Sequence, residues 1–127
     1  MDHEAVSTGN APAAIGPYSQ AIILGNLIFA AGQIPINPET GEVVASPIER
    51  QTEQVLKNLR AVLQAAGSDL THVVKATVYL SSMDDFEVFN KTYASFFTEP
   101  YPARATVAVA ALPKGVLLEI EAIAYRK

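Results

Sequence analysis

Apolar residues recur along the chain with two spacings, one typical of helices and one typical of strands. From position 48 to position 66 they follow the 3.6-residue period of one helix face, at Ile48, Val55, Leu56, Leu59, Val62, Leu63 and Ala66. Ser46 begins a capping box that Glu49 closes, with Pro47 at the first helical position. Gly67 offers a left-handed C-cap. We therefore predict a helix of about 19 residues, roughly 29 Å long.

A second helix is indicated by aromatic residues that recur at helical spacing. Its start is marked by Ser82 together with Asp85, and Pro100 and Pro102 end the segment. The aromatic positions are Phe86, Phe89, Tyr93, Phe96 and Phe97. A stripe of this kind could stack on bases, but its helical period favours a face packed into the core.

Five further apolar segments have the length and alternation of strands: 18–24, 27–32, 73–80, 104–111 and 116–125. Gly25 and Asn26 form a two-residue connection of the kind that closes a hairpin. Residues 112–115 form a turn that joins the last two strands, and residues 35–47 form a surface loop. We expect regular secondary structure to start at Tyr18, after an irregular arm that could itself be ordered.

The resulting order, ββαβαββ, predicts an α+β fold with one sheet and two helices on one face of it. The length of 127 residues corresponds to a single domain, 1–127. Residues that alternate away from the helices still include Ile22 or Ile23, Phe29, Leu117 and Ile123, which is too much apolar surface to leave in water. Self-association through this face, with pockets between subunits, is the expected solution.

Composition narrows the classes of function. Only 17% of the residues are charged, against about 25% in an average soluble domain, which also favours a subunit interface. A net charge of −4 without a basic run argues against a nucleic-acid partner. The absence of cysteine excludes thiolate chemistry, and His3 and His72 alone make a metal centre an unfavourable hypothesis. With no signal peptide and no membrane span in the sequence, we expect a cytoplasmic protein.

The residues with the strongest potential for chemistry lie in the last two strands. Arg104 stands at the mouth of an apolar strand, where a buried guanidinium needs an anionic partner. Period two puts Thr106 on the same face as Arg104, and it puts Glu119 and Glu121 together on one face of the next strand. If the two strands pair as a hairpin, Arg104 and a glutamate are neighbours. The residues alone leave two alternatives open: a structural ion pair across the sheet, or an arginine that binds a ligand carboxylate beside a glutamate acting as general acid or base.

Asn90 is a polar residue within the aromatic helix. It is interpreted either as a buried amide with its hydrogen bonds satisfied or as a contact to a ligand.

Several separate motifs resemble one protein family along nearly the whole chain. They are residues 10–20 (NAPAAIGPYSQ), 31–35 (AGQIP), 54–59 (QVLKNL), 74–80 (VKATVYL), 86–90 (FEVFN), 102–104 (PAR), 112–115 (LPKG) and 119–124 (EIEAIA). On these motifs the chain resembles the RidA family of imine deaminases, also called YjgF-like proteins.

The resemblance implies a homotrimer of chorismate-mutase-like protomers with three clefts between subunits. It implies hydrolysis of 2-imino acids, such as 2-iminobutanoate and 2-iminopropanoate, to 2-oxo acids and ammonia without a cofactor. In the family's motifs, Arg104 matches the residue that binds the substrate carboxylate, and Glu119 matches the one that holds or activates water. The positions that match the lining of the same cleft, partly from the neighbouring subunit, are Tyr18, Ala31, Gly32, Asn90, Thr106 and Pro113.

This chain departs from many relatives at two of those positions. Ala31 replaces a serine, so a hydroxyl contact is absent, and Thr106 replaces a cysteine, so a hydroxyl stands in for a thiol. The expected function is therefore imine deamination. A non-catalytic sensor of small carboxylates, using the same Arg104, and an RNA-directed activity are the alternatives.

Overall fold

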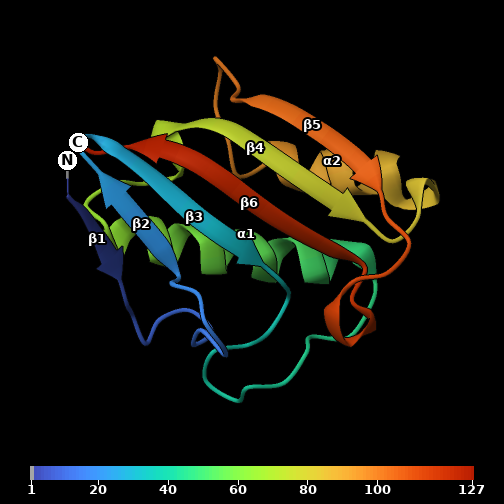
Figure 1. Ribbon diagram of the computed structural model, residues 1–127. Coiled ribbons are helices and arrows are strands. Elements are labelled where there is room, and N and C mark those ends of the chain that lie inside the picture. The colour runs from blue at the N-terminus through green and yellow to red at the C-terminus, as the bar shows by residue number, and fades with distance from the viewer. Residues whose placement is uncertain (1) are drawn as a thin grey trace.

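The computed structural model describes residues 2–127 as one six-stranded sheet with two helices on one face (Figure 1). The strands are β1 (His3–Val6), β2 (Ala21–Leu24), β3 (Leu27–Gln33), β4 (Val73–Leu80), β5 (Ala103–Ala108) and β6 (Leu118–Tyr125). The helices are α1 (Ile48–Ala65) and α2 (Phe86–Ala94), and short 3₁₀ turns cover Leu70–His72, Met83–Asp85 and Pro113–Gly115. The predicted α+β class, with both helices on one side, is confirmed.

The order of strands across the sheet is β1-β2-β3-β6-β4-β5, and it corrects the expected pairing of the last two strands. β6 lies between β3 and β4 and is antiparallel to both, whereas β5 forms the edge and runs parallel to β4. The hairpin between the last two strands was therefore a wrong prediction. The reason is topological: α2 carries the chain back after β4, and such a helical crossover places the following strand parallel to the first.

β1 is an element that the sequence pattern did not reveal. It pairs antiparallel with β2, from His3 opposite Leu24 to Val6 opposite Ala21. Val6 is its only buried residue, so there is no alternation strong enough to mark a strand. The expectation that structure starts at Tyr18 was wrong.

The long helix follows the predicted apolar stripe, because all seven of its apolar positions are buried. Its C-terminus is closed by Gly67 at φ 84°, and the N–H of Ser68 donates to the carbonyl of Leu63 at 2.9 Å. Its N-terminus differs from the prediction. Pro47 itself occupies the N-cap position, so Ser46 lies one residue outside and forms no capping box, and no other side chain in the described part of the chain caps the helix.

The aromatic stripe of the second helix is a core face, as predicted. Phe89, Tyr93 and Phe97 are buried, and Phe86 and Phe96 pack against the core from partly buried positions. At the start of this segment, Ser82 accepts a hydrogen bond from the N–H of Asp84 at 3.1 Å, which confirms it as a cap. α2 ends at Ala94, earlier than the prolines suggested.

The face of the sheet opposite the helices carries a row of apolar side chains across three strands. Ile22 on β2 lies opposite Phe29 on β3, which lies opposite Ile123 on β6. Phe29 is 40% exposed, and no helix of residues 2–127 covers this row (Figure 1). Leu117 was expected on the same face, but it precedes β6 and packs against the core instead. Neither helix in the described part of the chain is long and apolar enough to cross a membrane.

Candidate active site

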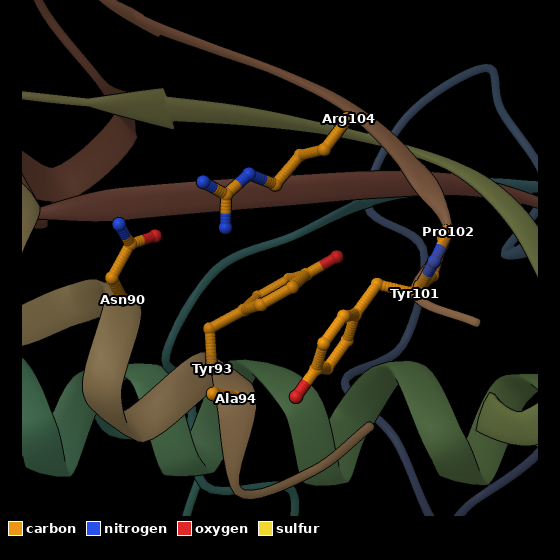
Figure 2. A pocket seen from close by; sticks show the side chains of 6 residues that line it. All are labelled: Asn90, Tyr93, Ala94, Tyr101, Pro102 and Arg104. Carbon is orange, nitrogen blue, oxygen red and sulfur yellow. The ribbon is translucent and has the colours of Figure 1, made fainter. Parts of the chain in front are cut away.

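Arg104 projects from β5 toward α2, on the helix side of the sheet. In the parallel register it lies beside Ala76, which is fully buried against the helices. Its guanidinium carbon lies 4.8 Å from the ring centroid of Tyr93 and 5.6 Å from that of Phe89. Figure 2 shows the guanidinium above the Tyr93 ring and extended toward Asn90. Aromatic faces attract a cation without neutralising it, so the positive charge of Arg104 is retained.

Three buried polar atoms near Arg104 have no hydrogen-bond partner among residues 2–127: Asn90 Oδ1, Tyr93 OH and Thr106 Oγ1. Thr106 follows Arg104 on the same face of β5, and Asn90 and Tyr93 come from α2. A buried polar group without a partner costs about 1–3 kcal/mol, so native structures rarely leave three together. Asn90 is thus not the satisfied buried amide that one interpretation expected.

A cavity of about 490 Å³ opens beside these groups. Its lining residues are Asn90, Tyr93, Ala94, Tyr101, Pro102 and Arg104 (Figure 2). Burial raises the pKa of Tyr93, with an opposing contribution from Arg104, so the phenol is a neutral hydrogen-bond donor at ordinary pH. The cavity therefore combines one fixed cation with neutral donors and acceptors, a combination suited to a small carboxylate.

Glu119 lies in a different cavity, of about 640 Å³. The sequence-predicted residues that share it are Tyr18, Ala31, Gly32 and Pro113. Lys114 also lines it, with φ at 57°, a left-handed conformation that is unfavourable for a residue with a Cβ. The sequence pattern did not single out Lys114, because a turn with Gly115 beside it gave no signal that the lysine itself adopts positive φ.

The geometry around Glu119 is set by a bulge in the neighbouring strand. Between Ala30 and Gln33 the register of β3 against β6 shifts, so that Gly32 faces the carboxylate. A Cβ built on Gly32 would lie 2.8 Å from Glu119 Cδ, closer than real contacts allow. Burial raises the pKa of Glu119, and the charge of Glu121 raises it further. A glutamate of this kind retains its proton to higher pH than an exposed one.

Arg104 and Glu119 lie on opposite faces of the sheet. Arg104 is in register with the buried Ala76, whereas Glu119 is opposite Tyr79 on the uncovered face. Within one chain they therefore form no ion pair, and the structural pairing considered from the sequence is wrong. The sequence-predicted residues divide into two groups: Arg104, Asn90 and Thr106 on the helix side, and Glu119, Tyr18, Ala31, Gly32 and Pro113 at the second cavity.

Sequence reasoning missed two residues that belong to these groups. Tyr93 was assigned to the core, which is correct, but its side chain also lines the Arg104 cavity. Tyr79 donates a hydrogen bond from its hydroxyl to Glu121 Oε1 on the uncovered face. The contact of Tyr79 with Glu121 could have been predicted only from the pairing of β4 with β6. Nothing in the neighbouring sequence distinguishes Tyr79 from other tyrosines in strands.

The fold and the two cavities describe a class of small α+β protein with a sheet left bare on one side and a cationic pocket on the other. Residues 8–126 match the model of a family described as endoribonuclease L-PSP. A RutC family protein of Pyrococcus horikoshii is 57% identical over 98% of both chains. The 2-iminobutanoate/2-iminopropanoate deaminase of Escherichia coli K12 is 51% identical over 96% of this chain and 97% of its own.

A crystal structure of the YjgF gene product of E. coli superposes with a TM-score of 0.92 at 48% identity, covering 98% of this chain and 99% of that one. The chain belongs to this family, known as RidA or YjgF-like. The names of two of its relatives, the E. coli deaminase and the Reactive Intermediate Deaminase A of Arabidopsis thaliana, support a RidA-type function.

Proposed function

We propose that this protein hydrolyses 2-imino acids, such as 2-iminobutanoate and 2-iminopropanoate, to 2-oxo acids and ammonia. The observation that carries the proposal is the state of Arg104: a guanidinium on an aromatic platform, beside three buried polar atoms that lack partners within residues 2–127. A small planar carboxylate supplies the missing anion and acceptors for the Tyr93 and Thr106 hydroxyls, and the N–H of an imino acid supplies a donor for Asn90 Oδ1. The name of the E. coli K12 relative, which is 51% identical to this chain, agrees with this substrate class.

The active site is proposed to form between subunits of a homotrimer. Arg104 and Glu119 open into separate cavities on opposite faces, so one substrate can reach both only if they come from different copies of the chain. The uncovered apolar row of Ile22, Phe29 and Ile123 gives such copies a reason to associate. In the closed ring, the Arg104 side of one subunit would meet the Glu119 side of the next.

The proposed reaction uses Arg104 from one cavity and Glu119 from the other. The forked guanidinium of Arg104 holds the substrate carboxylate and orients C2. Glu119 gives its proton to the imine nitrogen, and its carboxylate then takes a proton from the water whose oxygen bonds to C2. Glu119 returns this proton to the nitrogen of the carbinolamine. The C–N bond then breaks, its electron pair leaves with ammonia, and the remaining hydroxyl returns a proton to Glu119 as the C=O bond forms.

The remaining cavity residues are proposed to shape the site. Gly32 and Ala31 allow close approach of the substrate to Glu119, and Tyr18 and Pro113 form the walls. Asn90 and Thr106 bind the substrate beside Arg104. All parts of this reaction are supplied by side chains, water and substrate, and the proposal includes no cofactor.

The description of the family model names an endoribonuclease, but RNA is the less favoured substrate. A net charge of −4 opposes binding to a phosphate backbone, and the aromatic stripe that could have stacked on bases is in the core. Among residues 2–127, neither cavity is lined by more than one basic residue.

The test is to generate the imino acid with an amino-acid oxidase and to follow its decay with and without the protein. We expect Arg104→Met to lower kcat/KM by about 10²-fold or more, because the substrate carboxylate then loses its charged partner. Arg60→Met is the matched control, since Arg60 also lies over an aromatic ring, at 5.8 Å from Phe96, but borders neither cavity. No acceleration by the wild-type protein, or full activity in Arg104→Met, would refute the proposal. Binding of a 2-oxo acid without turnover would instead favour the carboxylate sensor.

A further inference from the structure

A cluster of three titratable side chains lies on the uncovered face of the sheet. Glu119 and Glu121 are two residues apart on β6 and share this face. Tyr79, on the neighbouring β4, lies directly opposite Glu119 and diagonally from Glu121. Side chains in these positions are within reach of one another across an antiparallel pair.

The two carboxylates have different surroundings. Glu121 accepts a hydrogen bond from the Tyr79 hydroxyl. Glu119 receives none from a donor in residues 2–127, and its carboxyl group is packed against the backbone of Gly32. A hydrogen bond to a carboxylate stabilises its charged form, whereas burial without a donor favours the protonated form. Two neighbouring carboxyl groups in unequal environments take on different protonation states, which is how acid and base roles are separated in many active sites.

The directions of the pKa shifts agree with this geometry. The pKa of Glu119 is raised, first by burial and then by the charge of Glu121. The pKa of Tyr79 is raised by its hydrogen bond to Glu121, by burial and by the charges of both glutamates, so its hydroxyl stays protonated and donates.

The other titratable groups around Glu119 do not reverse the direction of its pKa shift. Lys114 and Tyr18 line the same cavity, from the turn before β6 and from the N-terminal arm. The facing residue of β3 is a glycine, and Lys75 on β4 lies opposite Ile123, farther along the strand. Among the charged side chains of residues 2–127, Glu121 is the one whose charge shifts the pKa of Glu119, and it raises that pKa.

We propose that Tyr79 and Glu121 are positioning residues that favour the protonated form of Glu119. This inference rests on the proposed deaminase function, in which Glu119 gives its proton to the imine nitrogen. Tyr79 fixes the Glu121 carboxylate by its hydrogen bond, and the charge of Glu121 in turn favours the proton on Glu119. Neither residue needs to touch the substrate.

The location of the proton can be measured without any turnover. Protein labelled with ¹³C at the glutamate carboxyl carbons is titrated by NMR from about pH 4 to pH 9, and each signal is assigned by a glutamine substitution. We expect Glu119 to titrate above the ordinary glutamate range. Glu121→Gln should shift the Glu119 titration to lower pH, and Tyr79→Phe should narrow the interval between the two titrations. Glu53→Gln, an exposed change on α1, is the control for the loss of one negative charge.

The pH dependence of kcat/KM provides the functional measurement. In Glu121→Gln, the limb of the profile that belongs to Glu119 should move to lower pH, while the limb set by the imine itself stays in place. Tyr125→Phe, which removes a hydroxyl from the far end of β6, should leave both limbs unchanged. An inactive wild-type protein with unequal titrations would refute the deaminase function but not the location of the proton. Equal titrations of Glu119 and Glu121, or a Glu119 titration that does not respond to Glu121→Gln, would overturn the inference even in an active enzyme.

Discussion

Gly32 allows the position of Glu119 to be tested without removing any functional group. Its φ is not in the left-handed region, so alanine is compatible with the backbone, and the effect of Gly32→Ala is steric. The added Cβ would lie 2.8 Å from Glu119 Cδ and 3.1 Å from Cγ. Carbon atoms pack at about 3.5–4.0 Å, so the carboxyl group must move by roughly 1 Å.

A displacement of this size in a reacting group costs about 10²-fold in rate. We therefore expect Gly32→Ala to lower kcat/KM for 2-iminobutanoate by about 10²-fold in the oxidase-coupled assay, with little change in unfolding free energy because only the end of the Glu119 side chain has to move. Gly9→Ala is the matched control, because nothing lies within 4 Å of a Cβ at that position and its φ is also compatible with alanine. A folded Gly32→Ala protein with activity within about twofold of wild type would refute the placement of Glu119 against Gly32.

Two further predictions concern stability, and both are measured by urea denaturation. The pKa of Glu119 is raised on folding, so the stability associated with its protonated form is present below the unfolded-state pKa of about 4.3 and is lost as pH rises through the folded-state pKa. Glu119→Gln should accordingly be more stable than wild type at neutral pH, with the difference disappearing near pH 4; a constant difference across this range would contradict the assigned shift. Lys114→Gly should raise the free energy of unfolding by about 0.5–1 kcal/mol, because glycine adopts φ 57° without the steric cost of a Cβ. The more flexible unfolded chain of the glycine variant offsets only part of this gain. A destabilised variant would show that the lysine side chain stabilises the turn.

The elements that the sequence predicted correctly are those specified by local signals. α1 combines a continuous apolar stripe with Gly67 at the position where a left-handed residue closes the helix. The β2–β3 hairpin follows from the two-residue connection at Gly25, whose φ is 61°. Both depend on interactions over a few residues, so their signals lie within short stretches of the sequence.

The pairing of strands could not be predicted in the same way. Alternation assigns Glu119 to a face of its own strand, but it does not say which strand lies beside β6. The insertion of β6 between β3 and β4 depends on burying Leu118 and Ile120 in the centre of the sheet, which is a long-range effect. The consequence for the site is large, because it separates Arg104 from Glu119 within the protomer.

The surroundings of Arg104 were hidden for a related reason. The aromatic stripe of α2 was correctly assigned to the core, yet the ring of Tyr93 also supports the guanidinium from below. That second role appears only when β5 takes its place at the edge of the sheet over α2. Helical periodicity identifies which residues of α2 face inward, but not which of them meets a charged side chain there.

The central claim is that Arg104 of one subunit and Glu119 of another act on the same substrate molecule, and subunit mixing tests it directly. Arg104→Met and Glu119→Gln are each expected to be nearly inactive as pure proteins. When the two are co-expressed in equal amounts and assemble at random, each cleft has an even chance of an intact Arg104 and an even chance of an intact Glu119.

We therefore expect mixed trimers to recover about one quarter of the wild-type imine hydrolysis, and the recovery should vanish when either variant is mixed with itself. If Arg104 and Glu119 acted within one chain, every chain in the mixture would carry a defective site. Mixed oligomers without any recovery of activity would contradict the shared site.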